Sequence, residues 1–460
     1  MELHHGLLAL MRFVTTTGSA SPVSFTTALF DGLAPDGGLY VPERIEPWTP
    51  DELARLPRRT LTEIGLRAMR PFTRGELDPA VLEAVIVEAL NFEIPLVEVE
   101  RGVYALELFH GPTLAFKDVG ARVMARVMAS LHLAEDPLTV LVATSGDTGS
   151  AVAHAFHRVP HTRVVILYPD GRISPTQEAQ LTMFNGERAN VRAYAVAGSF
   201  DDCHKLTREA YADPDLRRSM RLTSANSVNV GRLLPQSVYY FHAIAQLAQM
   251  GLAGGNIVFS TPSGNFGNLT AGLMAKRAGL RIARFVAATN ANDVVPTYLE
   301  TGRFEPRASQ ATLSNAMDVG HPSNFDRMLW LYGSDLDAMR ADVTGCRFSD
   351  NDVRATINRV FEQRGYLLDP HSAIAYMGLG GRDGQDRQER QERQERQDRQ
   401  EGKIGVFLST AHPAKFSEIV EPIIGKPVEK PRALADALNG PQHIIRIRAS
   451  LDRVLGMLDG

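Results

Sequence analysis

One lysine of this sequence stands where a protein would make a reactive amine. Lys117 ends the turn-forming run that begins at His110-Gly111-Pro112 and opens a segment with helical periodicity, Asp118 to Ser130. Four apolar residues share its helical line, namely Leu114, Ala121, Met124 and Met128. Burial and the positive end of a helix dipole both disfavour an ammonium ion, so we expect a lowered pKa suited to a Schiff base or to proton transfer. The alternative is a lysine whose stem lies on apolar surface with its amine in water.

Two further segments carry groups that bind anions. Ser260 to Asn268 follows the apolar run Ile257 to Phe259, and its two glycines let the backbone approach a ligand at the start of the next helix. It has neither the ATPase loop motif nor the dinucleotide motif. Thr144 to Ala151 repeats the design with hydroxyls and amides that suit a carboxylate or a phosphate. Each loop alone also has a conformational explanation, as a strand end or an ordinary N-cap.

Composition and charge indicate a medium-sized soluble enzyme. With 460 residues the chain exceeds the roughly 250 to 300 residues of a single core, so two or three domains are expected. Its 49 basic and 53 acidic residues give a net charge of -4, which offers no field for nucleic acid or an anionic membrane. Cys203 and Cys346 lack the spacing of a metal site, so we expect reduced thiols in a cytoplasmic chain. We expect neither a metal site nor a membrane span.

Short apolar, β-branched runs alternate with helical patterns along the chain. They are Leu138 to Ala143, Val164 to Tyr168, Val191 to Val196, Asn256 to Ser260, Phe285 to Thr289 and Ile404 to Ser409. Such alternation predicts an α/β fold with parallel sheets covered by helices on both faces. We expect two α/β domains with a cleft between them, preceded by a cap with helices near 60–69 and 78–90.

The predicted boundaries follow from these patterns. Residues 1–100 form the N-terminal cap region, residues 101–125 with 216–460 form the large domain, and residues 126–215 form the small domain. Residues 381–402 repeat Arg-Gln-Glu and Arg-Gln-Asp triplets without apolar residues between Arg382 and Glu401. A segment of this kind has nothing to bury, so we interpret it as a surface insertion in the large domain.

The order and spacing of several segments resemble threonine synthase, a pyridoxal-phosphate-dependent family of the tryptophan-synthase β-like fold, also called fold type II. The similar segments are Gly32 to Pro42, His110 to Asp118, Thr144 to Ala151, Ser227 to Asn229 with Arg232, Pro262 to Asn268, and Leu408 to Phe416. The resemblance runs from about Met11 to near the C-terminus, with residues 381–402 as its main interruption. Agreement over this length is more specific than any single motif.

The resemblance implies a role for each segment. Lys117 would hold pyridoxal phosphate as a Schiff base and, once released, move protons at the α and β carbons of the substrate. The cofactor phosphate would lie on Gly264, Asn265, Phe266, Gly267 and Asn268, and Thr410 would offer its hydroxyl to the pyridine nitrogen. The substrate carboxylate would lie on Ser145, Gly146, Asp147 and Thr148, although many proteins of the wider fold carry Asn in place of Asp147. Ser227, Asn229 and Arg232 are candidates for the substrate phosphate, with a surface or packing role for Arg232 left open.

The implied reaction converts O-phosphohomoserine and water to threonine and phosphate, the last step of threonine biosynthesis. The cofactor would act as an electron sink. The protein would be a lyase, because phosphate is eliminated from the substrate. Two alternatives stay open: a dehydratase-like enzyme of the same fold acting on threonine or serine, and a non-catalytic binding protein that resembles threonine synthase. The resemblance leaves a monomer or a homodimer equally possible.

Overall fold

Two sheets form the centre of the computed structural model, which describes residues 10–132, 136–144, 146–186, 189–252, 254, 256–380 and 403–459. The larger sheet has the order β11 (Val343–Arg347), β10 (Arg284–Thr289), β9 (Asn256–Pro262), β12 (Lys403–Ser409), β4 (Val103–Glu107) and β3 (Leu96–Glu100). The smaller sheet has the order β13 (Ile445–Arg448), β7 (Val191–Ala197), β6 (Thr162–Pro169), β5 (Leu138–Ala143) and β8 (Arg221–Ser224). All neighbouring strands are parallel except β3 and β4. The expected parallel α/β fold is confirmed.

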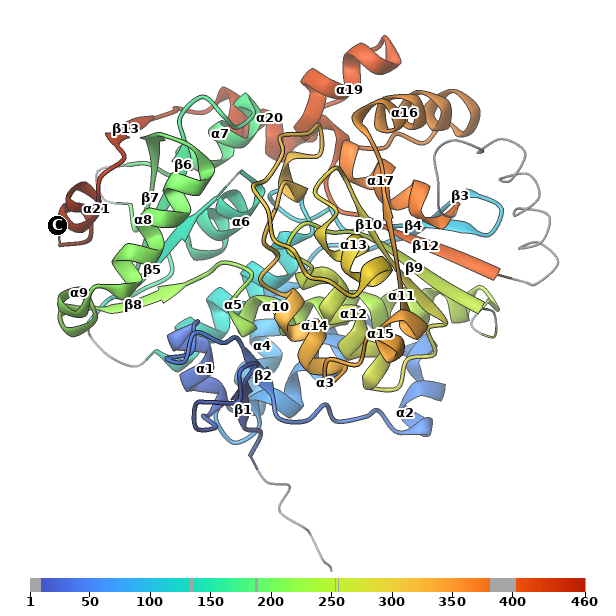
Figure 1. Ribbon diagram of the computed structural model, residues 1–460, viewed down its shortest axis with the longest axis horizontal. Helices are drawn as coiled ribbons and strands as arrows, with labels where there is room; N and C mark the ends of the chain where they lie inside the picture. The colour runs from blue at the N-terminus through green and yellow to red at the C-terminus, as the bar shows by residue number, and fades with distance from the viewer. Residues whose placement is uncertain are drawn as a thin grey trace, which may run out of the picture.

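Helices cover both faces of the larger sheet, with α11 (Ser237–Gln249) on one and α17 (Pro370–Leu379) on the other (Figure 1). Successive residues of a strand point to opposite faces, and β9 follows this rule. Phe259 packs edge-on against Tyr240 of α11, at 5.1 Å between ring centroids. Its neighbour Val258 belongs to the hydrophobic cluster of Ile374 on α17. Burial on both faces explains the continuous apolar run that identified this strand in the sequence.

The smaller sheet has the same arrangement. Its inner face carries Val140 of β5 and packs with α5 (Lys117–Leu131) and α6 (Asp147–Phe156). Its outer face carries Leu141 and is covered by α8 (Phe200–Ala212) and α21 (Leu451–Asp459). The chain leaves this sheet after β8 and returns to it near the C-terminus with β13 and α21 (Figure 1).

Sheet membership differs from the predicted domain boundaries at three strands. β3 lies in the predicted cap region yet pairs with β4 of the larger sheet. β8 and β13 lie in the range assigned to the large domain, yet they pair with β5 and β7 of the smaller sheet. The domain division stays a prediction, and these pairings argue for moving its boundaries at those strands.

The N-terminal region packs against α5, the helix that carries Lys117, and against α11 of the central core. Its two-stranded sheet joins β1 (Phe13–Thr15) to β2 (Tyr40–Pro42), and its helices are α1 (Phe25–Asp31), α2 (Pro50–Ala54), α3 (Leu61–Thr73) and α4 (Pro79–Ala89). Thr60 and Glu63 form a capping box at the start of α3. Arg122 of α5 donates to the carbonyl of Ala89 at the end of α4, at 2.8 Å. The predicted insertion at residues 381–402 lies outside the described residues, as do the first nine residues. Among the helices that the structure describes, none has the length and apolarity to cross a membrane.

Candidate active site

A buried aspartate holds the turn that presents Lys117. Asp118 accepts hydrogen bonds from the backbone N–H of Thr113 at 2.9 Å and from its hydroxyl at 2.7 Å. Gly111 lets the turn close, because a Cβ there would lie 2.5 Å from an oxygen of Asp118. Burial raises the pKa of Asp118 to about 6, although both Thr113 hydrogen bonds oppose that rise. Asp118 is thus committed to the turn, and Lys117 becomes the first residue of α5.

The segment after β12 lies directly beside this turn. The N–H of Phe116 donates to the carbonyl of Thr410 at 2.9 Å, and the N–H of His412 donates to that of Leu114 at 3.1 Å. The start of the segment is held to α17, because the hydroxyl of Ser409 lies 2.9 Å from the hydroxyl of Ser372. The structure therefore brings Lys117 and Thr410, which are far apart in sequence, to adjacent positions on paired backbone.

The environment of Lys117 makes its ammonium form less favourable than it is in water. Burial lowers its pKa from 10.5 to about 8, and the nearby charges of Arg232 and Lys415 lower it further, whereas Asp147 raises it. Lys117 remains partly exposed, so a ligand can reach it. A lysine of this kind is a nucleophile and a proton carrier near neutral pH.

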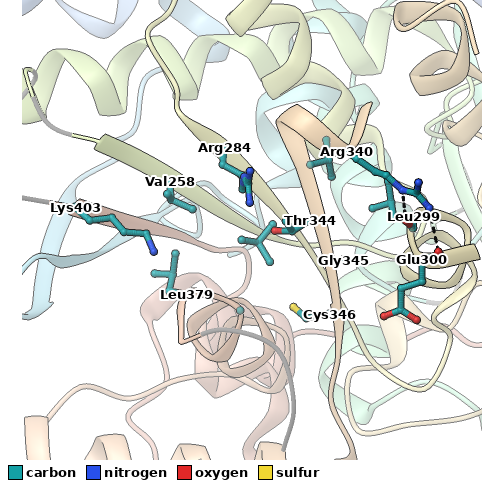
Figure 2. A pocket seen from close by; sticks show the side chains of 13 residues that line it. Val258, Arg284, Leu299, Glu300, Arg340, Thr344, Gly345, Cys346, Leu379 and Lys403 are labelled. Carbon is teal, nitrogen blue, oxygen red and sulfur yellow. Dashed lines mark hydrogen bonds between the residues drawn. The ribbon is translucent and has the colours of Figure 1, made fainter. Parts of the chain in front are cut away.

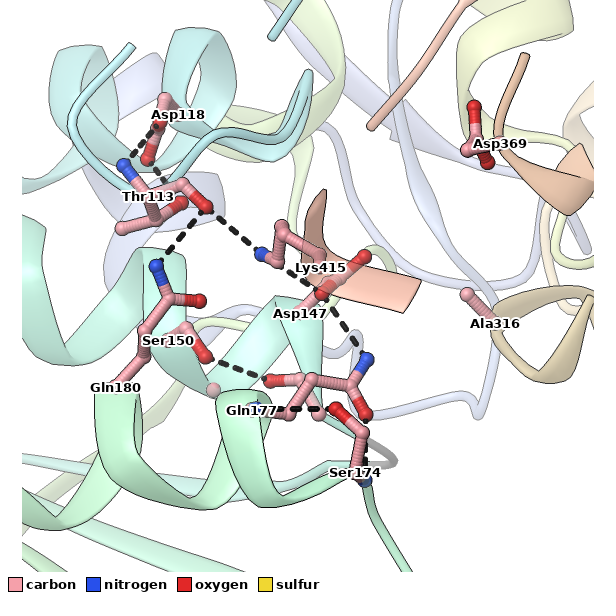
Figure 3. A network of polar contacts seen from close by, with 12 residues as sticks. Thr113, Asp118, Asp147, Ser150, Ser174, Gln177, Gln180, Ala316, Asp369 and Lys415 are labelled. Atoms are coloured by element: carbon pink, nitrogen blue, oxygen red, sulfur yellow. Dashed lines mark hydrogen bonds and ion pairs between the residues drawn. The ribbon is translucent and has the colours of Figure 1, made fainter. Parts of the chain in front are cut away.

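The aspartate whose charge acts on Lys117 is itself held by a second lysine, as Figure 3 shows. Asp147, the first residue of α6, lies 2.9 Å from the amine of Lys415, and both side chains are almost completely buried. Burial alone would raise the pKa of Asp147, but the charges of Lys415 and Lys117 outweigh it and lower the pKa below the usual value. Asp147 is therefore an anion that the charges of Lys415 and Lys117 stabilise.

The loop between β9 and α12 (Gly267–Arg277) has the geometry of an anion site. Phe266 precedes α12 in the left-handed conformation, with φ at 59°, and supplies no side-chain cap. The side chain of Asn268 turns inward, accepting from the hydroxyl of Ser263 at 2.8 Å and donating to the carbonyl of Pro262 at 2.9 Å. Gly264 packs against Met317, where a Cβ would lie 2.7 Å from the Cα. The fixed loop thus presents backbone N–H groups at the positive end of a helix.

Asn265 links this loop to the segment that carries Ser227. Its amide nitrogen donates to the hydroxyl of Ser227, and its oxygen accepts from the N–H of Ser323. The carbonyl of Ser227 accepts from Arg327, a fully buried arginine that also donates to the carbonyls of Tyr40 and Val228. Asn265 therefore ties Ser227 to the loop, and Arg327 ties it to Tyr40 of the N-terminal region.

Arg232 is buried next to α5 with hydrogen-bonding capacity left over. It lies in the short helix α10 (Val230–Leu233), and its Nη1 donates to the carbonyl of Ala225 at 2.6 Å. Its Nε has no hydrogen-bond partner among the described residues, although Arg232 is only 4 % exposed. Burial lowers the pKa of Arg232 to about 10, so it stays charged at neutral pH. A buried cation with an unused donor is suited to an anionic ligand.

Four predicted substrate-binding residues remain: one shapes its own segment, two lie at the start of α6, and one is outside the described residues. Asn229 caps α10, and its amide donates to the carbonyls of Leu29 and Ser224, so its side chain shapes the segment. Gly146 precedes α6 with φ at 131°, and Thr148 is partly exposed in the first turn of that helix. Ser145 lies outside the described residues.

A separate cavity lies beside β11, an edge strand of the larger sheet. It has a volume of about 660 Å³ and is lined by residues of four strands, among them Val258 of β9, Arg284 of β10, Thr344 of β11 and Lys403 of β12 (Figure 2). Thr410 and the Gly264 loop follow the carboxyl ends of β12 and β9. Ligand sites of parallel sheets lie at the carboxyl ends, so the region of Lys117 is the candidate active site.

Several supporting residues were missed by the sequence reasoning. Asp369 caps α17 and pairs with the imidazole of His371 at 2.7 Å, beneath the Ser372–Ser409 contact. The Asp369-Pro370 step was a readable helix-start signal. Arg327 gave no such signal, because its partners are backbone carbonyls from distant segments. His412 shapes the turn after β12, since its Nδ1 accepts from the N–H of Ala414 at 3.1 Å.

Three sequence families match successive parts of the chain. Residues 12–90 match the family described as threonine synthase N terminus, residues 87–396 match pyridoxal-phosphate dependent enzyme, and residues 389–456 match threonine synthase, C-terminal. The threonine synthase of Haemophilus influenzae is 45% identical over 416 residues, which cover 90% of this chain and 91% of that protein.

Solved structures agree with these matches. The crystal structure of threonine synthase from Escherichia coli superposes with a TM-score of 0.87 at 39% identity, covering 98% of this chain and 100% of that one. Pyridoxal-phosphate-bound threonine synthase from Brucella melitensis gives a TM-score of 0.87 at 35% identity, covering 97% and 98%. The similarity extends over the sheets, the N-terminal region and the C-terminal return together.

Proposed function

The chain belongs to the threonine synthase family of pyridoxal-phosphate-dependent enzymes, and from that premise we propose that it converts O-phosphohomoserine and water to threonine and phosphate. The observation that carries the proposal is the placement of one amine. Lys117, with a pKa near 8, follows a turn that is paired with the Thr410 segment, and the charges of Asp147 and Arg232 act on its amine. The arrangement supplies a nucleophile, a proton carrier and anion sites in one region of the fold.

The residues present fit pyridoxal phosphate. Lys117 offers an amine to its aldehyde, and the uncapped start of α12 offers backbone N–H groups to its phosphate. Gly264, Asn265, Phe266, Gly267 and Asn268 make up that phosphate loop. The hydroxyl of Thr410 is a neutral partner for the pyridine nitrogen. When bound, the cofactor supplies an electron sink for negative charge that develops on the substrate.

The chain itself binds the substrate and moves its protons. We assign the substrate carboxylate to Gly146 and Thr148 at the start of α6, where a hydroxyl and backbone N–H groups meet a helix dipole, and to Ser145, the residue before them in the sequence. Arg232 and Ser227 bind the substrate phosphate, and Asn229 keeps their segment in place. Once free, the amine of Lys117 carries protons one at a time: it takes one from the α carbon, releases it, and then takes one from the β carbon as phosphate leaves the γ carbon. A pKa near 8 is suited to such reversible transfer.

The alternatives have less support. A dehydratase of the same fold does not account for the threonine synthase matches at both ends of the chain, residues 12–90 and 389–456. A non-catalytic protein does not account for a half-buried lysine with a lowered pKa near an arginine with an unused donor. We further propose a cytoplasmic location, since both cysteines are buried free thiols, and a monomer or homodimer.

The test is an assay of phosphate and threonine from O-phosphohomoserine by the purified, cofactor-loaded protein, with threonine and serine as parallel substrates. Equimolar phosphate and threonine are expected. Arg232→Leu should raise KM by about 10- to 100-fold, because a charge-assisted hydrogen bond contributes about 1.5–3 kcal/mol. Arg284→Leu, which removes an exposed arginine at the other cavity, is the matched control. Ketoacid from threonine or serine without turnover of O-phosphohomoserine would establish the dehydratase instead.

A further inference from the structure

An acidic residue at the start of α6 is out of place in an anion site. Asp147 is the first residue of the helix whose amino end we assign to the substrate carboxylate. Two carboxylates in one pocket repel each other, and the repulsion is strong where water is excluded. Asp147 is only 4 % exposed, so solvent does not screen it. Some other group has to balance its charge.

Lys415 supplies that charge from the far end of the chain. It lies in the short helix η4 (Pro413–Phe416) after β12, is fully buried, and places its amine 2.9 Å from Asp147. The same amine donates to the carbonyl of Thr113 at 2.7 Å, in the turn that presents Lys117. Figure 3 shows the amine between these two acceptors. One ammonium group therefore contacts both the start of α6 and the turn before α5.

Two glutamines of α7 (Pro175–Thr182) complete the arrangement. Gln177 donates to the same oxygen of Asp147 at 3.1 Å, and Gln180 donates to the carbonyl of Thr113 at 3.3 Å. Both acceptors of Lys415 are thus oriented by a helix of the small-sheet region. The contacts of Lys415 join its own segment after β12 to the start of α6 and to the turn before α5. Each of these three segments contributes a group to the candidate active site.

We propose that Lys415 is a positioning residue, which neutralises Asp147 and fixes the turn at Thr113, so that Lys117 and the start of α6 are held in one arrangement with balanced charge. Nothing in the proposed reaction requires Lys415 to touch the substrate. Its contribution to substrate binding rests on the proposed function, whereas its effect on Lys117 does not.

The charges around Lys117 determine the sign of the expected effects. Lys117 faces Asp147, Arg232 and Lys415, and Asp147 also faces His371. Removal of Lys415 takes away a repelling cation, so the pKa of Lys117 should rise. Removal of the charge of Asp147 takes away an attracting anion, so the pKa of Lys117 should fall. A double variant without either charge should lie between the two single variants.

The experiment measures the proton affinity of Lys117 directly in the full-length chain without cofactor. Trace acetylation at a series of pH values, followed by peptide mass spectrometry, gives the labelling midpoint of this one lysine. Lys415→Met should raise the midpoint by about one pH unit, a tenfold loss of free amine below it, and Asp147→Asn should lower it. Lys415→Arg keeps the charge and should stay near the wild type. Lys276→Met, which breaks the 2.7 Å pair with Asp342 elsewhere in the chain, is the matched control and should change nothing.

The second measurement uses the cofactor-loaded enzyme. Lys415→Met leaves Asp147 unbalanced and should raise KM for O-phosphohomoserine by at least tenfold, and Asp147→Asn in the same chain should recover part of that loss. If O-phosphohomoserine is not a substrate, the proposed function fails while the labelling result still stands. Unchanged labelling midpoints in both Lys415→Met and Asp147→Asn would overturn the inference. If Lys415→Met does not fold, Asp147→Asn still tests the charge balance, because a labelling midpoint of Lys117 that does not fall would overturn it.

Discussion

Replacement of Lys117 by methionine should make the chain without cofactor more stable at pH 7. The pKa of Lys117 falls from 10.5 to about 8 on folding, chiefly because the amine is buried. Each pKa unit corresponds to about 1.4 kcal/mol, so the ammonium form costs the folded chain on the order of 3 kcal/mol. Lys117→Met removes this cost and keeps a side chain of similar length on the apolar line of α5.

The pH dependence separates this effect from simple apolar packing. Below pH 8 both the folded and the unfolded wild-type chain hold the proton of Lys117, so the whole cost is present. Between pH 8 and 10.5 only the unfolded chain holds it, so the wild type gains stability as the pH rises. The advantage of Lys117→Met should therefore shrink across that window.

Thermal unfolding at several pH values measures the difference. Unfolding entropy is about 2 cal/mol/K per residue, or roughly 1 kcal/mol/K for the whole chain, so the melting temperature of Lys117→Met should be about 3 °C higher at pH 7. If α5 melts with only part of the chain, the entropy is smaller and the shift larger. Lys276→Met removes a lysine from an ion pair with Asp342 and should give no gain. A melting temperature no higher than that of the wild type at pH 7, or a difference that persists unchanged to pH 10.5, would refute the reasoning.

Two further perturbations test the loop and the buried arginine. Gly264→Ala should weaken cofactor binding at least tenfold in a fluorescence titration, because the new Cβ would lie 2.7 Å from the Cα of Met317; Gly456→Ala, at a glycine with open space, should bind normally. Arg327→Met should lower the free energy of unfolding by about 3–5 kcal/mol, since it leaves buried carbonyls of Tyr40 and Val228 without donors. Urea unfolding of the chain without cofactor measures this loss, and a change below about 1 kcal/mol would contradict it.

Local patterns in the sequence predict the parts of the fold that are buried on both sides. The strand expected at residues 138–143 is β5 with the same bounds, and each of the other expected runs is a strand. The strands missed include the edges β8 and β13. β13 reads Ile-Arg-Ile-Arg, and an edge strand with charged residues on one face carries no continuous apolar run. Its pairing with β7 is a long-range choice that no local pattern specifies.

The candidate site shows the same division between local and distant information. The positions of Lys117, the Gly264 loop and Thr410 follow from short motifs at strand ends and helix starts, because each of these is a local feature of the backbone. The partners of Asp147 do not follow in this way. Lys415 reaches it from the other end of the chain, and only the packing of β12 beside the turn of Lys117 makes that contact possible.

The charges of the site explain why stability and function oppose each other here. Lys117 is half-buried and Arg232 is buried, with pKa values lowered to about 8 and about 10, so each cation is held at a cost to the folded chain. Asp147 offsets part of this charge but is itself paired with Lys415. The remaining positive charge is available for phosphate groups, which the family's cofactor carries and the proposed substrate also carries. Lys117→Met should therefore stabilise the chain without cofactor because it removes a charge that the ligands would otherwise balance.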